Sequence, residues 1–148
     1  MGEVLHLFQA IAHGEPVREF DEVSAVENRG FQDCIHGRPG SRRQVLLMDF
    51  ETLQELGISP GSVKENITTR GLGLVGLAEG QRVRAGEVLL EVTVPCTPCG
   101  QMDEIRQGLK EALRGRRGVL CRVLEPGRIR RGDPIEVIPQ QAVSRGNA

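Results

Sequence analysis

The chain has 148 residues, of which 39% are hydrophobic and 26% are charged, so it is long enough for one domain with its own core. A net charge of −1 argues against nucleic-acid binding by bulk electrostatics. No apolar run approaches the roughly 20 residues that span a bilayer, and the N-terminus lacks the basic segment and cleavage site of a secretory signal. We therefore expect a cytoplasmic protein with no nucleic-acid or membrane partner.

The first third of the chain predicts strands separated by a long irregular stretch. Residues 3–13 are expected to form the first strand. Residues 14–42 are rich in Gly, Pro and Asn and predict turns and loops, with short β-like pieces near Val17 and Phe20. The compact apolar run Q-V-L-L-M at 44–48 predicts a buried strand.

A short helix is expected to follow directly, over residues 49–57. Asp49 can cap its N-terminus, because aspartate accepts hydrogen bonds from the first free N–H groups of a helix. Leu53 and Leu56 fall on one face, and Gly57 is placed to end the helix.

The next segment, G-S-V-K-E-N-I-T-T-R-G at 61–71, is polar and bounded by glycines. Asn66, Thr68, Thr69 and Arg70 could line a polar pocket by hydrogen bonding. The same residue types also commonly cap turns, so the sequence leaves both interpretations open.

Two later segments resemble each other. Residues 80–92 contain V-R-A-G-E, and residues 127–137 contain I-R-R-G-D, each followed by an alternating apolar pattern. Each predicts a strand, a tight turn at the glycine and a second strand that enters a sheet. An architecture of many short strands joined by glycine turns is typical of a barrel or a folded sheet.

The strongest helical pattern lies between these two segments. Its apolar residues recur at steps of three and four, with acidic residues in the first turn, and Gly108 weakens it. The apolar positions are Met102, Ile105, Leu109 and Leu113.

Residues 119–124 are predicted to return to a strand. Residues 140–148 have no periodic pattern and are expected to be a disordered tail. The domain is therefore expected to span residues 1–139.

The four cysteines are at positions 34, 96, 99 and 121. In a cytoplasmic protein they are expected to be reduced thiols, metal ligands or catalytic groups rather than a disulfide framework.

The stretch V-P-C-T-P-C-G-Q-M at 94–102 places Cys96 and Cys99 between a predicted strand and a predicted helix. A zinc site would need a second pair of ligands at suitable spacing, and Cys34 with His36 is an incomplete substitute, so zinc is not favoured.

Three other interpretations of this pair stay open. A strand before the pair and a helix after it suit a redox dithiol, although the thioredoxin fold orders its elements differently around such a motif. Cys99 could instead act alone as a nucleophile, sulfur carrier or metal ligand, because a helix N-terminus favours the thiolate. Both cysteines could also simply fill space at a strand end.

Arginine dominates the basic side chains, since only Lys64 and Lys110 among 19 basic residues are lysines. His36 lies in a glycine-flanked loop with three nearby arginines, where it could contact an anion or a cofactor or simply be solvated. The arginine clusters at 114–117 and 128–131 could form a phosphate-binding rim or solvated turns.

An ordered set of segments resembles the MOSC domain, the C-terminal domain of molybdenum-cofactor sulfurases, which also occurs as small stand-alone bacterial proteins. The set begins with D-x-x-H-G at 33–37 and R-Q-V-L-L at 43–47, and continues with the 61–71 segment and L-L-E-V-T before Pro98-Cys99. It ends with G-V-x-x-R-V-L at 118–124 and I-R-x-G-D at 129–133. The resemblance covers residues 4 to 138.

This resemblance implies a mainly β fold, a MOSC-type β-barrel with a few short helices. It implies that Cys99 binds sulfur or coordinates molybdenum, with Cys96 as a second catalytic thiol that resolves or accepts a persulfide. Contacts to the molybdenum cofactor, molybdopterin, are then expected from His36, Arg43, Glu65, Asn66, Thr68 and Arg70.

The expected function is sulfur carriage or binding of the molybdenum cofactor, with a cysteine desulfurase or a cofactor-biosynthesis protein as sulfur donor. Some relatives suggest instead a molybdenum-dependent reductase of N-hydroxylated compounds. A non-catalytic cofactor-binding module and a C-x-x-C redox protein are further alternatives.

Overall fold

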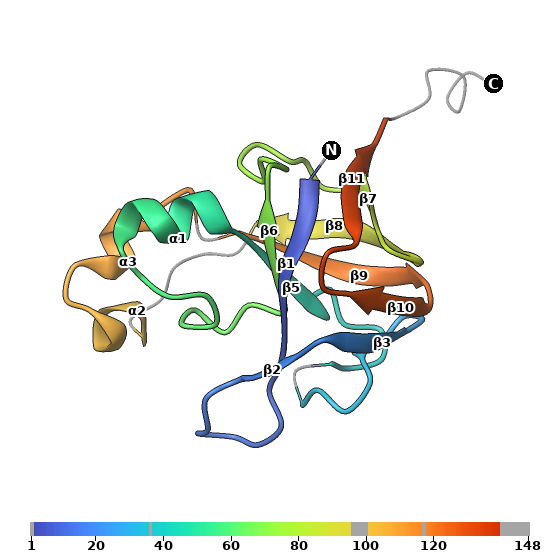
Figure 1. Ribbon diagram of the computed structural model, residues 1–148, viewed down its shortest axis with the longest axis horizontal. Helices are drawn as coiled ribbons and strands as arrows, with labels where there is room; N and C mark the ends of the chain where they lie inside the picture. Colours follow the sequence, from blue (N-terminus) through green and yellow to red (C-terminus); the bar gives the residue numbers. More distant parts are fainter. Residues whose placement is uncertain (1, 36, 96–100, 117, 140–148) are drawn as a thin grey trace.

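The computed structural model describes residues 2–35, 37–95, 101–116 and 118–139. Strands alternate with short connections along most of these residues, which also form three short helices (Figure 1). The elements are β1 (Gly2–Gln9), β2 (Arg18–Phe20), β3 (Glu22–Val26), β4 (Gly30–Phe31), β5 (Val45–Asp49), α1 (Phe50–Leu56), β6 (Ile67–Arg70), β7 (Arg82–Ala85), β8 (Val88–Pro95), α2 (Gln101–Ile105), α3 (Leu109–Ala112), β9 (Val119–Glu125), β10 (Gly127–Arg130) and β11 (Pro134–Ile138).

The main sheet closes into a barrel. Its strands follow the order β11-β7-β8-β9-β5-β6-β1, and β11 pairs again with β1 to close the ring, while β2 extends from β1. This confirms the predicted mainly β, barrel-type fold. Closure removes the free sheet edges that an open sheet of this size would expose.

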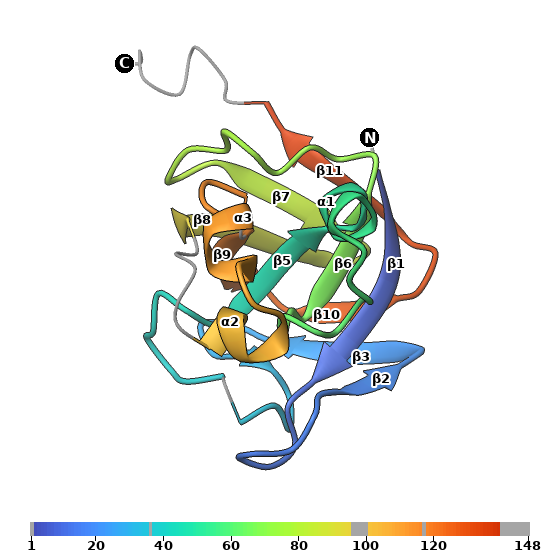
Figure 2. The same ribbon diagram turned by 90° about the vertical axis from the view of Figure 1, so that its left-hand side faces the viewer.

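One pair in the ring, β5 with β6, is parallel, and the other pairs are antiparallel. A parallel pair needs a crossover connection, and residues 50–66 provide it by carrying α1 over the barrel wall (Figure 2). The crossover therefore brings the polar 61–71 segment, which contains β6, into the barrel wall beside β5.

The two segments with similar sequences fold differently. β7 and β8 form an antiparallel hairpin in which Ala85 pairs with Val88, as predicted. β10 and β11 do not pair with each other, because β10 joins β3 and β4 in a separate three-stranded sheet and β11 joins the barrel. The strand–turn–strand pattern was therefore predicted correctly at 127–137, but the strands enter two different sheets.

Two apolar clusters hold the fold together. The larger fills the barrel and contains inward residues of its strands, such as Val45, Leu47 and Ile67. The smaller lies between the barrel wall and the helices and contains Met48 and Met102 among others. Val45 and Leu47 of β5 belong to the larger cluster and Met48 to the smaller, so both faces of this strand are covered, which explains the apolar run that precedes Asp49.

The helical pattern after residue 100 is broken into two helices. Gly108 has a φ of 85°, a left-handed conformation that glycine adopts without steric cost, and it separates α2 from α3. Met102, Leu109 and Leu113 are buried as the pattern predicts. Ile105, the last residue of α2, is 41% exposed, so the predicted apolar face does not hold at this position.

The helix at Phe50–Leu56 is confirmed, and Gly57 ends it with a φ of 71°. Asp49 occupies the N-cap position, but its side chain makes no capping hydrogen bond. Its carboxylate instead accepts hydrogen bonds from the Leu74 N–H and the Thr69 hydroxyl. The predicted capping role of Asp49 is therefore wrong.

Across the described residues, every helix is too short or too polar to span a membrane.

Candidate functional site

Cys96 and Cys99 lie outside the described residues, and so does His36. The elements on both sides of the cysteine pair are described: β8 ends at Pro95 and α2 begins at Gln101. The pair therefore lies in the connection between a strand and a helix, which is the setting that the sequence predicts. Met102, on the first turn of α2, packs in the apolar cluster beneath the helices.

Asn66 cross-links three segments of the barrel. Its side-chain oxygen accepts from the Leu46 N–H at 2.9 Å, and its amide nitrogen donates to the Phe8 carbonyl at 3.2 Å and to Cys34 Sγ at 3.6 Å. The side chain is 4% exposed. The whole amide is thus used to hold β1, β5 and the loop at Cys34 in register.

Glu65 and Thr68 form a second buried polar contact beside it. Both are fully buried, and the Thr68 hydroxyl donates to Glu65 Oε2 at 2.8 Å. The same oxygen accepts from the Gly61 N–H at 2.9 Å. The other carboxylate oxygen, Oε1, is buried and accepts no hydrogen bond from the part of the chain that the structure describes. An acceptor in this state is available for an N–H or O–H donor.

Asp49 is the group in this region whose pKa departs from its ordinary value. Burial raises the pKa of the Asp49 carboxyl, and the hydrogen bonds from Leu74 and Thr69 oppose the rise. The Asp49 carboxylate thus joins Thr69 of β6 and Leu74 of the following loop to β5, and the buried Thr69 side chain does not face an open surface.

The two predicted arginine contacts lie at the surface. Arg70 Nη2 is 2.6 Å from Glu3 Oε1, and both side chains are about half exposed. The Arg43 backbone N–H donates to Ser41, while its exposed guanidinium makes no ion pair with any described residue. Of these two arginines, Arg43 is therefore the one whose guanidinium can bind an anion without first breaking an ion pair to a described residue.

The two remaining cysteines are buried. Burial raises the pKa of the Cys121 thiol, and the negative charge of Glu91 adds to the rise, so this thiol stays protonated at neutral pH. Cys34 is 6% exposed, and its sulfur lies 3.4 Å from the Ala10 N–H as well as near Asn66. Both thiols pack within the barrel core.

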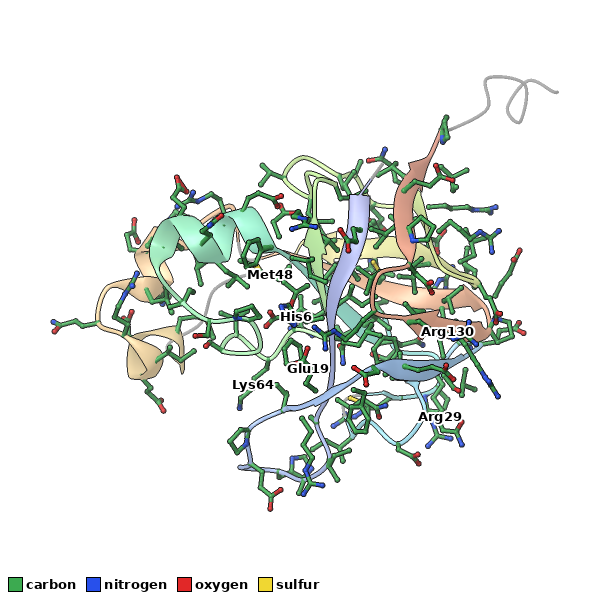
Figure 3. The ribbon with its side chains drawn as sticks, viewed as in Figure 1. His6, Glu19, Arg29, Met48, Lys64 and Arg130 are labelled. Carbon is green, nitrogen blue, oxygen red and sulfur yellow. The ribbon has the colours of Figure 1, made fainter. Side chains whose placement is uncertain are left out.

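The first histidine also lies within the framework. His6 Nδ1 is 2.6 Å from Glu19 Oε2 (Figure 3). The His6 ring also stacks on Phe8, with 5.9 Å between ring centroids. The contact with Glu19 joins β1 to β2, whereas the stack lies within β1.

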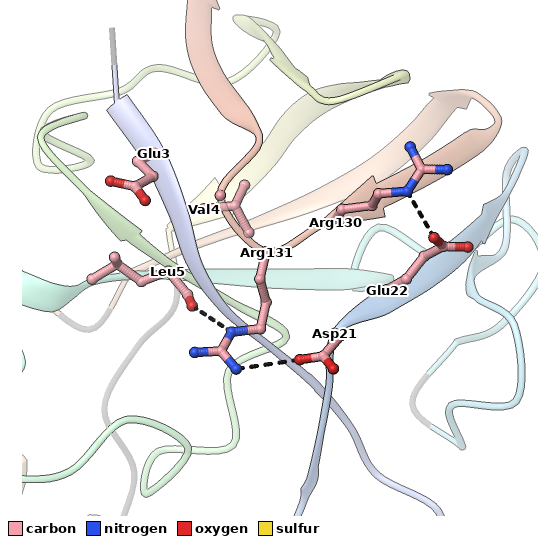
Figure 4. Close-up of a pocket in the computed structure, with 8 residues that line it drawn as sticks. Glu3, Val4, Leu5, Asp21, Glu22, Arg130 and Arg131 are labelled. Carbon is pink, nitrogen blue, oxygen red and sulfur yellow. Dashed lines mark hydrogen bonds and ion pairs between the residues drawn. The ribbon is translucent and has the colours of Figure 1, made fainter.

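A cavity of about 520 Å³ lies where β1 passes the turn between β10 and β11 (Figure 4). The arginines around it are already paired: Arg131 binds the Leu5 carbonyl and Asp21, and Arg130 binds Glu22 at 2.8 Å. The arginine cluster at 128–131 thus joins β10 and its turn to β1 and β3. Its charge is neutralised by neighbouring carboxylates.

A second cavity, of about 230 Å³, lies on the outer side of β8 and β9, and sequence reasoning did not identify it. It is lined by Arg42, Glu79, Glu91, Thr93 and Arg122, which come from separate parts of the chain. The sequence offers one indication of this cavity, which is that two of its residues lie near candidate site residues. Thr93 lies three residues before Cys96, and Arg42 lies next to Arg43.

Among the described residues, His, Cys, Asp and Glu side chains do not gather in a group of three or more that could hold a metal ion. Cys96, Cys99 and His36, which lie outside the described residues, are not covered by this statement.

Comparison with known proteins gives one consistent result. The MOSC domain family matches residues 33–136 of the chain. The YuaD protein of Bacillus subtilis superposes with a TM-score of 0.82 at 21% identity, covering 95% of this chain and 98% of that one. No curated protein sequence gives a significant match.

Two further solved structures share the fold. The YiiM protein of Geobacillus stearothermophilus has a TM-score of 0.76 at 18% identity and covers 96% of this chain and 77% of its own. The YiiM protein of Escherichia coli has a TM-score of 0.69 at 21% identity, with 95% and 71% covered.

Proposed function

Since this chain belongs to the MOSC domain family, a family associated with the molybdenum cofactor, we propose that it carries sulfur on Cys99 in molybdenum-cofactor or sulfur metabolism. The observation that carries the proposal is the match over residues 33–136, which includes the connection between β8 and α2. The buried state of Cys34 and Cys121 supports it, because a sulfur carrier needs an accessible thiolate and these two thiols are enclosed.

The proposed transfer keeps its electrons in balance. The Cys99 thiolate attacks the outer sulfur of a persulfide on the donor, a cysteine desulfurase or cofactor-biosynthesis protein. A new S–S bond forms to Cys99, the S–S bond of the donor breaks, and the donor cysteine leaves as a thiolate. No net oxidation or reduction occurs.

Cys96 is proposed to resolve the persulfide. Its thiolate attacks Cys99 Sγ, a disulfide forms between the two cysteines, and the outer sulfur leaves as hydrosulfide. Two molecules of a low-molecular-weight thiol then reduce the disulfide, forming a disulfide between themselves, and return both cysteines to the starting state.

The described residues offer two groups that fit the molybdenum cofactor itself. Glu65 Oε1 is a buried acceptor without a donor among the described residues, and it suits the N–H groups of a pterin. Arg43 carries an exposed guanidinium without an ion pair among those residues, and it suits a phosphate. When bound, the cofactor would supply a molybdenum centre, for which Cys99 is the proposed ligand.

The other residues expected to contact the cofactor are proposed to act indirectly. The side chains of Asn66 and Thr68 are hydrogen-bonded to other buried groups of the barrel. They would therefore position Glu65 and β6 rather than contact the cofactor. Arg70 would reach an anion only by leaving Glu3, an exposed pair that costs little to break. His36 is proposed as a further contact.

Mass spectrometry tests the sulfur-carrier proposal. The purified chain is incubated with a cysteine desulfurase and cysteine, and the mass of one sulfur atom is expected on the peptide that contains Cys99. The Cys99→Ser variant should show no such gain, whereas Cys96→Ser, the matched control, should keep it and hold it longer. An equal gain in wild type and Cys99→Ser would refute the proposal.

A separate measurement addresses the cofactor. After expression with ample molybdate, acid oxidation of bound molybdopterin should yield a fluorescent pterin from wild type and less from Glu65→Gln. Pterin fluorescence without any sulfur gain on Cys99 would favour the cofactor-binding role over the carrier role.

A further inference from the structure

The cavity on the outer side of β8 and β9 has a pattern of charges that the sulfur chemistry does not use. Arg42 Nη2 lies 2.8 Å from Glu79 Oε2, and Arg122 Nε lies 2.6 Å from Glu91 Oε1. The cavity thus holds two positive and two negative side chains arranged as two neutral pairs.

The framework around these pairs is fixed by the backbone. The pairing of β8 with β9 shifts register between Val92 and Val94, which places a bulge at Thr93. The Thr93 hydroxyl lies between the carbonyl oxygens of Arg42 and Leu120, and Arg42 Nη2 donates to the Thr93 carbonyl at 3.0 Å. β-Bulges often redirect side chains near functional sites. Here the contacts between Thr93 and Arg42 hold one end of the cavity against β8.

The pairs themselves can exchange partners. Arg42 and Glu79 are 56% and 70% exposed, whereas Arg122 and Glu91 are 45% and 21% exposed, so the first pair is the easier one to open. Exposed ion pairs contribute roughly 0–1 kcal/mol, so a ligand with suitable charges can replace them. A volume of about 230 Å³ limits that ligand to a small molecule.

The charge arrangement selects the kind of ligand. A simple anion that replaces a glutamate on an arginine leaves that glutamate without a partner, and a simple cation that replaces an arginine does the reverse. A molecule that carries both a carboxylate and an ammonium can replace both partners at once, and a planar guanidinium matches a carboxylate with two parallel hydrogen bonds.

We propose that this cavity binds a free α-amino acid, with the carboxylate held by Arg42 and Arg122 and the ammonium held by Glu79 and Glu91. Binding here does not depend on sulfur transfer at Cys99, so the two proposals can fail separately.

L-Alanine is the probe, titrated into the full chain and followed by calorimetry and by NMR shifts of the residues that line the cavity. Propionate lacks the ammonium and ethylamine lacks the carboxylate, so each is expected to bind at least about tenfold more weakly than alanine. Glu79→Gln and Arg122→Gln are each expected to weaken alanine binding by about tenfold.

The matched control is Arg84→Gln, which breaks a comparable exposed pair, Arg84 Nη1 to Glu125 Oε1 at 3.1 Å, outside the cavity. It should leave alanine binding unchanged. The proposal is overturned if alanine gives no saturable shift, if propionate or ethylamine binds as tightly as alanine, or if Arg84→Gln weakens binding as much as Glu79→Gln does.

Discussion

The chain uses similar polar side chains in two regions with opposite consequences. On β6 and its neighbours, Glu65, Asn66, Thr68 and Thr69 are buried and bound to the framework. On the outer side of β8 and β9, charged side chains such as Glu79 meet as exposed pairs around a cavity. The difference teaches that burial decides the role of a polar residue, because a buried group must keep its partner while an exposed group can exchange it with water or a ligand.

The largest effect is expected at Asn66. Replacing Asn66 by leucine leaves the Leu46 N–H and the Phe8 carbonyl buried without their partner, and it should lower the free energy of unfolding by about 3 kcal/mol. Urea unfolding followed by circular dichroism measures the change.

The matched control is Gln81→Ala, which removes an exposed amide whose oxygen accepts from the Ala78 N–H. We expect this change to cost less than about 1 kcal/mol. Equal losses in the two variants would contradict the difference between buried and exposed polar groups.

The sequence could predict most of the barrel but not the partners of its buried polar groups. The apolar run at 44–48 and the patterns at 80–92 and 119–124 predicted β5, β7, β8 and β9, because each signal is local. The partners of Asn66 lie 20, 32 and 58 residues away along the chain, and those of Asp49 lie 20 and 25 residues away. No local pattern can therefore indicate them. Asp49 resembled a helix cap for the same reason, since its competing donors at Thr69 and Leu74 become visible only in the fold.

The site was partly predictable for a related reason. The strand before Cys96 and Cys99 and the helix after them follow from local patterns, and both are present at Pro95 and Gln101. The cavity at Thr93 combines residues from the loop before β5, the loop before β7 and two strands, so its assembly depends on barrel closure.

An intermediate effect is expected at Asp49, and it depends on pH. Burial raises the pKa of this carboxyl above its ordinary value of 3.8, so the folded state binds the proton more tightly than the unfolded state does. The stability that this proton provides is fully present below the unfolded-state pKa and is lost as the pH rises through the folded-state pKa.

Asp49→Asn removes this titration. At low pH the variant should be less stable than wild type by about 1 kcal/mol, because asparagine replaces a protonated carboxyl that fits its partners. The deficit should shrink as the pH rises toward neutral, when wild-type Asp49 must ionise in a buried position. Urea unfolding at a series of pH values measures it, with Glu104→Gln, at an exposed position of α2, as the control. A deficit that grows with pH would contradict the raised pKa.

The smallest effect on stability is expected at Glu79, which belongs to the exposed ion pairs around the cavity. Glu79→Gln removes one partner of Arg42, but both side chains are more than half exposed, so water can replace the lost contact. Arg42 also keeps its hydrogen bond to the Thr93 carbonyl. The free energy of unfolding should therefore change by less than about 0.5 kcal/mol. A loss as large as that of Asn66→Leu would show that the Arg42–Glu79 pair is a fixed part of the framework, and a fixed pair could not exchange its partners with an amino acid.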